Sequence, residues 1–362
     1  MTSPPIAHLL SEARDRTDVV AGALLERVEA GPAQVLAYQW GLRDAAGRPV
    51  PAGGGGRGKA VRAALVFAAA RATGRPCSDP LVAAGATAVE MLHTLSLLHD
   101  DVMDGDTLRR GRPAAWRVFG AEAVENAVRH LTPHAVGLLF DAAVRPEPDP
   151  AAGPRAPEVL RGPARAAGVL GAALVRLAQG QALDLALEQE ARPGAAATLR
   201  VHADKTGSLF SCACELGAAP TAAAELAAFG EHLGVAFQIT DDVLGIWGDP
   251  LVTGKSAGSD LAARKKSYPV AVALAPTTAS DSADDARRRL AHLYARTEPW
   301  TAAETDEARR LLDHTGARSA AEAAARRHEQ TALDALSRIC PPHQEAAQDL
   351  RALAAFVTGR PN

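Results

Sequence analysis

The chain has 362 residues, 47% of them hydrophobic, and its 39 basic and 42 acidic residues leave a formal net charge of -3. A chain of this length and composition can bury a large core, in one large domain or in two ordinary ones. The near balance of charge gives no reason to expect a general electrostatic attraction to nucleic acid or to an anionic membrane. A local basic site remains compatible with this balance.

The cysteines and the N-terminal sequence bear on the compartment. None of the four cysteines belongs to a CxxC pair of the kind that binds zinc, so a reducing compartment fits best. Cys212 and Cys214 are interpreted as small core residues, with a metal or redox role as the alternative. No basic N-terminal region precedes an apolar stretch, and no window approaches about 18 consecutive strongly apolar residues. We therefore expect a cytoplasmic protein without stable membrane insertion.

The spacing of apolar residues predicts an all-α fold. Apolar residues recur at intervals of three and four, alanine and leucine dominate, and no stretch alternates as a strand would. The clearest predicted helices run from Leu81 to Val102, from Leu226 to Leu244 and from Ala321 to Arg338, each bounded by glycine, proline or aspartate clusters.

Two stretches have the composition of loops. Residues 53–58 include four consecutive glycines, which tolerate positive φ and could let backbone amides approach an anion. Residues 145–163 contain six prolines and predict an inserted surface loop between helices. Because the helical pattern resumes on both sides of each stretch, we expect a single domain over 1–362 with a loop insertion at 145–163.

The first acidic motif lies near the end of the helix predicted from Leu81. The residues that share one side of this helix are Glu90, His93, Leu97, Asp100, Asp101 and Asp104. Three carboxylates within five residues repel one another, and burying them is costly unless cations or hydrogen-bond donors compensate. Oxygen ligands without clustered histidine or cysteine suit a hard ion such as Mg²⁺. The alternative is an exposed acidic helix end.

Three arginines follow the first acidic motif. Arg109, Arg110 and Arg112 all lie within eight residues of Asp104. Acidic residues followed by basic ones suit a metal-bridged diphosphate, in which carboxylates hold the metal and guanidinium groups bind the phosphate oxygens. A plain ion-pair network among these side chains is the alternative.

A second acidic motif lies in the helix predicted from Leu226. Gln238, Asp241 and Asp242 share one side of that helix, and two facing acidic helices could clamp a cluster of metal ions. Other polar and charged residues of interest are Lys59 and Arg62 after the glycines, Gln181 with Asp184, Lys205 with Thr206, and Lys255, Asp260, Arg264, Lys265 and Lys266 after the second motif.

In this order, the motifs resemble those of the trans-isoprenyl diphosphate synthases, the polyprenyl synthetase family that includes farnesyl and geranylgeranyl diphosphate synthases. The resemblance runs from Gly58-Lys59 to the final helix. Its most specific elements are Leu98 to Asp104 with Asp106 to Pro113, and Phe237 to Asp242 with Gly254-Lys255 and Asp260-Leu261.

The resemblance implies a fold, an activity and an assembly. The fold is a bundle of long antiparallel helices around a deep apolar cavity, usually in a homodimer. The activity is that of an enzyme, a trans-prenyltransferase that condenses isopentenyl diphosphate with an allylic prenyl diphosphate after Mg²⁺-dependent ionisation. By position, the implied Mg²⁺ ligands are Asp100, Asp101, Asp104, Asp241 and Asp242, with Gln181 and Asp184 near them.

The resemblance also assigns the substrate groups. The residues implied to hold the allylic diphosphate are Arg109, Lys205 and Lys255, and those implied to bind isopentenyl diphosphate are Lys59, Arg62, His93 and Arg110. Thr206 and Gln238 would line the reacting centre, and Lys265 is a further expected substrate-binding residue. The expected catalytic group therefore consists of Asp100, Asp101, Asp104, Asp241, Lys205, Thr206 and Gln238.

The sequence departs from the family pattern at several positions. Gly245 stands where the second motif usually has a third aspartate, with Asp249 the nearest replacement, and Ala60 replaces an arginine that usually follows Lys59. Trp116 replaces a common histidine, and the helix after Phe119 carries Glu125-Asn126 in place of a Gly-Asp pair. These departures leave open a terpene cyclase-like or noncatalytic homologue on the same scaffold, and a helical interaction protein with acidic surface motifs is a third possibility.

The residues one helical turn before Asp100 predict the product length. A prenyl tail that grows toward the N-terminus of this helix would meet Leu95 and Ser96. Since neither side chain is aromatic, we expect a cavity that admits more than a farnesyl chain, and geranylgeranyl diphosphate as the product.

Overall fold

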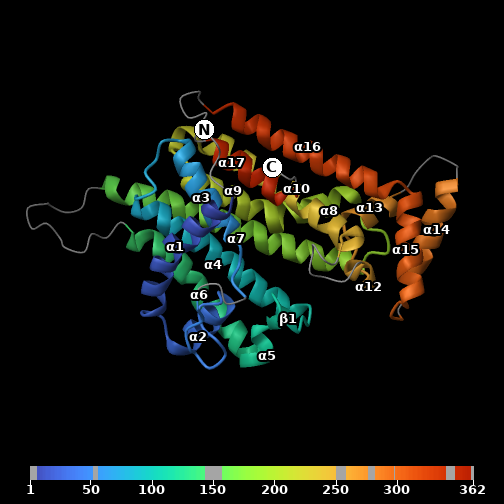
Figure 1. Cartoon of the computed structure of the whole chain (residues 1–362), viewed down its shortest axis with the longest axis horizontal. Helices are drawn as coiled ribbons and strands as arrows, with labels where there is room; N and C mark the ends of the chain where they lie inside the picture. The colour runs from blue at the N-terminus through green and yellow to red at the C-terminus, as the bar shows by residue number, and fades with distance from the viewer. Residues whose placement is uncertain are drawn as a thin grey trace, which may run out of the picture. The chain divides into compact units, whose positions relative to one another are not determined.

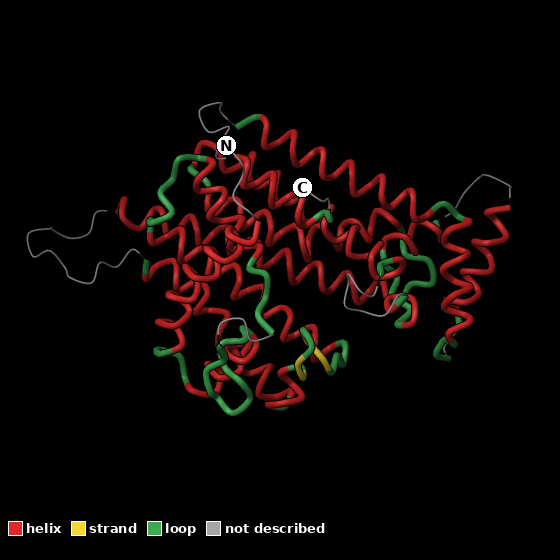
Figure 2. Tube along the Cα trace, in the orientation of Figure 1, coloured by secondary structure: helices red, strands yellow, loops and turns green. Residues whose placement is uncertain are grey.

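The computed structural model describes residues 6–51, 56–142, 157–249, 258–275, 282–296, 298–339 and 347–359. This part of the chain is almost entirely helical (Figure 2), so the predicted all-α fold is confirmed. In chain order the helices are α1 Ile6–Leu25, α2 Ala30–Gln39, α3 Val61–Ala72, α4 Pro80–Met103, α5 Ala115–Phe119, α6 Ala121–Asp141, α7 Pro157–Gln189, α8 Ala195–His202, η1 Ala203–Gly207, α9 Ser208–Gly217, η2 Pro220–Ala222, α10 Ala223–Trp247, α12 Ser259–Ala262, α13 Tyr268–Leu274, α14 Ser282–Ala295, α15 Ala302–His314, α16 Ala317–Ser337 and α17 Ala347–Val357 (Figure 1).

One short hairpin interrupts the helices. Its strands are β1, Leu108–Arg109, and β2, Arg112–Pro113, which pair antiparallel with Arg109 opposite Arg112. The sequence predicted no strand here, because a two-residue strand is too short to show alternation.

The chain divides into two compact units. Unit 1 comprises residues 1–174, 212–226 and 340–353, and unit 2 comprises residues 175–211, 227–339 and 354–362. The first acidic motif lies in unit 1 and the second lies in unit 2.

The central helix of unit 1 is α4, which packs against α1, α3 and α6. It begins where the Asp79 side chain accepts a hydrogen bond from the Leu81 backbone N–H, with Pro80 in the first turn. Both devices satisfy or remove donors that a helix start leaves without partners. The helix agrees with its predicted bounds, and its apolar residues, such as Leu92 and Leu98, are buried.

Unit 2 is built around α10, α13 and α16. Helices α10 and α16 match the two other predicted helices within a few residues. Ile239 of α10 lies in one core cluster with Tyr268 of α13 and Ala324 of α16. Ile246 of α10 lies in a second cluster with residues of α13, α14 and α15, so both faces of the end of α10 are packed.

The loop predicted at 145–163 ends earlier in the structure than in the prediction. Residues 145–156 of the expected insertion lie outside the described residues, but α7 begins at Pro157, so 157–163 is helical. Pro157 lies in the first turn of α7, where a proline removes no hydrogen bond because that N–H has no partner in the helix, whereas Pro163 lies inside the helix. The composition of this stretch therefore overestimated the length of the loop.

Two other expectations concern burial. Cys212 and Cys214 of α9 are free thiols and fully enclosed, as expected of small core residues. Among the described residues, two helices are long and apolar enough to cross a membrane by length and composition alone, α4 with 67% of its apolar window buried and residues 161–189 of α7 with 22%. Because buried core helices pass the same test, it does not make α4 a membrane span.

Candidate active site

The first group of candidate residues lies in unit 1, at the acidic end of α4. We call Arg62, His93, Asp101, Arg109 and Arg110 the α4 site. They come from α3, α4 and the β1–β2 hairpin.

Asp101 is the most enclosed carboxylate of the α4 site. Its side chain is 1% exposed, and its Oδ1 accepts a hydrogen bond from Arg109 Nε at 2.8 Å. Its Oδ2 is buried without a hydrogen-bond partner in the described part of the chain. The Gln39 amide lies close enough to favour the charged carboxylate, but its Nε2 does not reach hydrogen-bond geometry with any described residue. One carboxylate oxygen is therefore available to a cation.

Burial and charge act against each other at Asp101. Burial raises the pKa of this carboxyl above its ordinary value of 3.8, although the Arg109 guanidinium opposes the shift. The folded protein thus disfavours the charged form of Asp101 relative to the unfolded chain. A bound cation would reverse that penalty.

Arg109 links the acidic motif to the hairpin. Its Nη2 donates to Asp101 and, at 3.1 Å, to Asp106 Oδ2. The ion-pair network left open from the sequence is therefore formed in this structure. Trp116 supports the same segment, because its indole N–H donates to the Asp106 carbonyl at 2.7 Å.

The hairpin places three arginines on a tight turn. Arg110 and Gly111, its two central residues, have φ values of 51° and 73°, as a type I′ turn requires. Arg110 touches the glycine segment, since a Cβ on Gly58 would lie 2.8 Å from Arg110 Nη2. Arg112 stacks over the Tyr38 ring at 4.2 Å. The glycines at 56 and 58 thus allow guanidinium groups to approach closely, where the sequence had suggested an anion.

Non-glycine residues with positive φ lie near the candidate residues in the sequence. The non-glycine residues with positive φ in the described ranges are Ala60, Arg110 and Arg264, at 56°, 51° and 53°. Ala60 lies between Lys59 and Arg62 in sequence, and Arg264 precedes Lys265. Such conformations cost on the order of 1–3 kcal/mol and occur often at functional sites.

Arg62, His93 and Arg110 form a basic cluster around Glu90. Burial lowers the pKa of Arg62 to about 10, with Glu90 opposing and Arg110 adding to the shift, so Arg62 stays charged at neutral pH. Burial and the charges of Arg62, Arg110 and Arg109 hold the pKa of His93 well below 6.5. Glu90 also accepts a hydrogen bond from the Ala63 backbone N–H at 3.0 Å. The cluster keeps its guanidinium charges and a neutral imidazole.

The other predicted residues of unit 1 lie around this core. Asp100 is half-buried, Asp104 is exposed and caps α4, and Lys59 is exposed. Leu95 is 3% exposed, and Ser96 donates its hydroxyl to the His93 carbonyl at 2.8 Å. Within the described ranges, no three or more His, Cys, Asp or Glu side chains gather closely enough to hold a metal ion.

The second group lies in unit 2. We call His202, Asp242, Asp260, Lys265 and Tyr268 the α10 site. They surround the second acidic motif near the end of α10.

Asp242 is fully buried and fully hydrogen-bonded. Its Oδ2 accepts from the Tyr268 backbone N–H at 2.9 Å and faces His202 Nε2 at 3.1 Å. Its Oδ1 faces Lys265 Nζ at 3.3 Å and Gln238 Nε2 at 3.5 Å. Burial opposes ionisation, but Lys265 and His202 outweigh it and hold the pKa of Asp242 below its usual range. The sequence predicts Asp242 as an Mg²⁺ ligand, whereas the structure gives both its oxygens protein donors.

Asp260 packs against Gly245, the residue that stands where the second motif usually has a third aspartate. A Cβ on Gly245 would be 2.4 Å from Asp260 Oδ2, so the Asp260 carboxylate lies directly against the α10 backbone there. Lys265 reaches this carboxylate at 3.6 Å and is about half exposed. Asp241 and Asp249 are exposed, and Lys255 lies outside the described residues.

Lys205 and Thr206 lie in η1, a π-helical turn within the helix formed by α8 and α9. Lys205 Nζ pairs with Asp184 Oδ2 at 2.8 Å, and the Thr206 hydroxyl donates to Gln238 Oε1 at 2.9 Å. The structure therefore brings four of the predicted residues of unit 2 together. The sequence did not predict this turn, because a π turn has no residue signature that distinguishes it from an α turn.

Several residues of these sites were missed from the sequence. They are Gln39, His202, Tyr268, Arg176 and Asp204. His202 could have been noted one helical turn before Thr206, but its partner Asp242 is 40 positions away in the chain. Only the folded structure shows the pair, in which His202 Nε2 lies 3.1 Å from Asp242 Oδ2.

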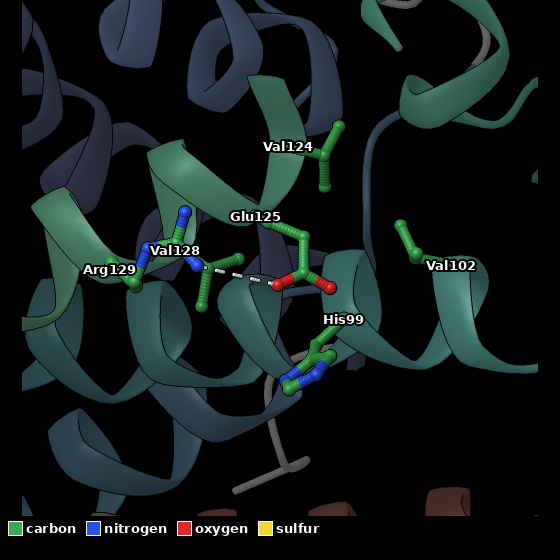
Figure 3. Close-up of a pocket in the computed structure, with 6 residues that line it drawn as sticks. All are labelled: His99, Val102, Val124, Glu125, Val128 and Arg129. Atoms are coloured by element: carbon green, nitrogen blue, oxygen red, sulfur yellow. Dashed lines mark ion pairs between the residues drawn. The ribbon is translucent and has the colours of Figure 1, made fainter. Parts of the chain in front are cut away.

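A small pocket lies between α4 and α6, with a volume of about 50 Å³ (Figure 3). Its lining residues are His99, Val102, Val124, Glu125, Val128 and Arg129. Glu125 pairs with Arg129 at 3.6 Å across its wall. Since a cavity needs about 10–15 Å³ of such volume to hold one water molecule, this pocket has room for a few waters and is too small for a prenyl chain. Glu125, which stands in place of the family's usual residue in this helix, thus forms an ion pair with Arg129 in the wall of a pocket beside α4.

Known proteins share both the sequence and the fold. The sequence pattern of the family described as Polyprenyl synthetase matches residues 53–312. The (2E,6E)-farnesyl diphosphate synthase of Mycobacterium tuberculosis is 36% identical over 345 residues, 93% of this chain and 88% of that protein. The geranylgeranyl diphosphate synthase of the same organism is 36% identical over 319 residues, 84% of this chain and 81% of that protein.

Solved structures agree with these relatives. The polyprenyl synthetase of Streptomyces coelicolor A3(2) superposes with a TM-score of 0.85 at 34% identity, over 98% of this chain and 99% of that one. The polyprenyl synthase of Caulobacter crescentus CB15, solved with calcium and isoprenyl diphosphate, superposes with a TM-score of 0.74 at 27% identity, over 99% of both chains.

The helical fold and the ordered acidic and basic motifs define a class of isoprenoid-forming enzymes. This chain belongs to the polyprenyl synthetase family. It is a trans-prenyltransferase related to short-chain prenyl diphosphate synthases.

Proposed function

We propose that this protein condenses isopentenyl diphosphate with an allylic prenyl diphosphate, head to tail, and that geranylgeranyl diphosphate is the product. One observation carries the proposal: Asp101 presents a buried oxygen without a described partner beside the arginines of the α4 site. A cation site next to an anion site suits a metal-bridged diphosphate.

The residues present fit Mg²⁺. The proposed ligands offer only carboxylate oxygens, the donors that Mg²⁺ prefers, and Asp101 Oδ2 is a buried acceptor with no donor among the described residues. The calcium bound to the Caulobacter relative supports a hard divalent ion. Asp100, Asp101 and Asp104 are the proposed ligands at the α4 site, and Asp241 is proposed as a ligand on the family resemblance alone. When bound, the ion would supply positive charge that stabilises a departing diphosphate.

The arginines would bind the two diphosphates. Arg62 and Arg110, with Lys59, would bind isopentenyl diphosphate, and the neutral His93 could donate a further hydrogen bond. Arg109 would exchange part of its contact with Asp101 for a contact with the allylic diphosphate. Charge-assisted hydrogen bonds of guanidinium groups to phosphate are strong and directional.

In unit 2, Lys205 is proposed on the family resemblance to bind an allylic diphosphate. Asp184 holds its ammonium group at 2.8 Å in the structure, and Thr206 with Gln238 would face the reacting carbon atoms. Lys255 and Lys265 are further proposed substrate contacts. The reaction needs no side-chain nucleophile: the allylic C–O bond ionises, the isopentenyl double bond attacks the cation, and the released diphosphate takes the proton.

Asp242 takes a different role in this proposal. Because protein donors engage both its oxygens and no part of it is exposed, we propose that it anchors α10 and is not an Mg²⁺ ligand. The ligand from the second motif would then be Asp241.

The product length is proposed from α4. Leu95 and Ser96 precede Asp100 by about one turn, and neither side chain is bulky enough to close the path of a growing chain. The relatives do not decide between farnesyl and geranylgeranyl products, since both kinds are 36% identical to this chain. Ser96→Phe should shorten the main product by one isoprene unit. An unchanged product spectrum would refute this placement.

A homodimer in the cytoplasm completes the proposal. The homodimer is proposed on the family resemblance. The free, buried cysteines suit a reducing compartment. Sedimentation of the purified protein should give twice the chain mass, and a monomer at micromolar concentration would contradict the dimer.

The activity test is incubation with Mg²⁺, isopentenyl diphosphate and each allylic primer, followed by mass spectrometry. We expect a C20 diphosphate, and no product when a chelator is added. No elongated diphosphate with any primer would overturn the proposal. A cyclic hydrocarbon formed from one prenyl diphosphate alone would favour the terpene cyclase alternative.

A further inference from the structure

The π turn that carries Lys205 and Thr206 is held by side chains from its own helix and from α7. In a π turn the backbone is wider than in an α-helix, and the usual carbonyl partners are displaced. Two carbonyls of η1 accept side-chain hydrogen bonds, Ala203 from Arg176 Nη2 at 3.1 Å and Asp204 from the Ser208 hydroxyl at 2.6 Å. Arg176 belongs to α7, so one of these contacts joins two helices of unit 2.

Arg176 makes two further contacts at the turn. Its Nε donates to Asp204 Oδ1 at 3.0 Å, and its Nη1 donates to Glu231 Oε2 of α10 at 2.7 Å. Asp204 is 3% exposed and takes a second guanidinium, Arg200 Nε, at 2.6 Å. The Arg176 side chain therefore connects α7, η1 and α10 at one point.

Glycines let the neighbouring helices approach the same turn. A Cβ on Gly180 of α7 would lie 2.8 Å from the Lys205 backbone nitrogen and 2.9 Å from Lys205 Cγ. A Cβ on Gly234 of α10 would lie 2.7 Å from Gly207 Cα. Backbone thus contacts backbone on both sides of η1, with no side chain between them to absorb a change of shape.

We propose that Arg176 is a positioning residue, which through Asp204 and the Ala203 carbonyl fixes the π turn and so orients Lys205 and Thr206. Without this clamp the segment can relax toward a regular α-helix, which rotates the residues that follow it. Lys205 would then leave Asp184, and Thr206 would leave Gln238. The inference rests on the proposed function, since it gives Lys205 and Thr206 a task in prenyl transfer.

The first test is hydrogen exchange on the free protein, which needs no substrate or metal. In Arg176→Met we expect faster exchange of backbone amides in peptides that cover 203–209, with the rest of unit 2 unchanged. The matched control is Arg200→Met, which removes the other guanidinium on Asp204 but no contact to the Ala203 carbonyl. Equal exchange at 203–209 in both variants and the wild type would overturn the proposal.

The second test separates positioning from stability by steady-state kinetics. Arg176→Met should lower kcat on the order of 100-fold while KM for isopentenyl diphosphate changes less than about 3-fold. Arg176→Lys should recover part of kcat, because it keeps a charge on Asp204, and Arg200→Met should stay near the wild type. Gly180→Ala should repeat the kcat loss from the opposite side of the turn.

The outcomes distinguish the two proposals. A wild-type protein with no prenyl transfer at all would refute the proposed function and leave the exchange test of the clamp standing. An active wild type in which Arg176→Met and Gly180→Ala keep their kcat would refute the positioning role alone. If Arg176→Met does not fold, the kcat and the exchange at 203–209 are compared between the wild type, Arg176→Lys and Gly180→Ala instead.

Discussion

Asp101 and Asp242 are both buried aspartates in acidic motifs, yet their surroundings differ. Asp101 in the α4 site meets one arginine and keeps one oxygen without a partner among the described residues, and its pKa is raised by burial. Asp242 in the α10 site meets a histidine, a lysine, an amide and a backbone N–H, and its pKa is lowered.

This difference separates a carboxylate prepared for a ligand from one that holds the fold. A buried charge without full compensation weakens the folded state, and the protein tolerates it where function needs it. A buried charge with a full set of donors strengthens its surroundings, because removing it leaves those donors without a partner. Position in a motif therefore does not by itself assign a metal ligand.

Neutralising each aspartate should give the largest contrast. Asp101→Asn should lower prenyl transfer by about 10²–10³-fold, as the loss of one electrostatic contact at a reacting group does, with little change in stability, since its charged form is already disfavoured. Asp242→Asn should cost about 3 kcal/mol of unfolding free energy, as for a broken buried ion pair. Denaturant unfolding and a rate assay on both variants check this, and equal stability of the two would break the comparison.

The contact at Gly245 should give the next effect. Gly245→Ala places a methyl group 2.4 Å from Asp260 Oδ2, so we expect a loss of about 1–3 kcal/mol from overpacking. Gly171→Ala in α7, where no atom lies within 4 Å of the added Cβ, should instead gain up to about 1 kcal/mol from helix propensity. Denaturant unfolding of both variants tests this. A loss of the same size at both glycines would show that Asp260 does not fill the site.

The hairpin turn offers a change that separates stability from binding in the α4 site. Arg110 occupies a φ of 51°, which asparagine adopts more readily. Arg110→Asn should raise the unfolding free energy by about 1 kcal/mol and raise KM for isopentenyl diphosphate by about 10-fold, the loss of one charge-assisted hydrogen bond. Arg110→Lys, which keeps the charge and the strain, is the control. A lower stability of Arg110→Asn would argue against the turn assignment.

The smallest effect concerns pH and lies in unit 2. Burial, with His232, Arg327 and His202 adding and Glu231 opposing, lowers the pKa of His328 below 6.5, and its Nδ1 lies 3.0 Å from His232 Nδ1. As pH falls through 6.5, His328 binds a proton in the unfolded chain but stays neutral in the folded protein. The free energy of unfolding therefore decreases. His328→Asn should reduce the drop in Tm between pH 7.5 and pH 5.5. An unchanged drop would rule out this histidine pair as a cause.

The sequence predicted the helices well because their apolar spacing is local. It predicted the candidate residues by resemblance, and the structure brings Lys205, Thr206, Gln238 and Asp184 together. It could not predict the partners of Asp242, since His202 and Tyr268 reach it only through the packing of three helices.

Other features had a weak signal in the sequence or none. Arg-Gly is a weak signature of a type I′ turn, whose usual residues are Asn-Gly, so the hairpin at 108–113 was not expected. The π turn at 203–207 has the composition of an ordinary helix. Gly245 was recognised as a missing aspartate, but the carboxylate of Asp260 that lies against it comes from a separate helix.

The most direct test of the difference between the two aspartates is thermal unfolding with and without Mg²⁺ and inorganic diphosphate. A ligand that binds only the folded state raises Tm. We predict that the wild type and Asp242→Asn both gain Tm on addition of the two ions, the latter from a lower starting value, and that Asp101→Asn gains none. A full gain in Asp101→Asn together with none in Asp242→Asn would contradict the assignment of Asp101 as the metal ligand and Asp242 as the anchor.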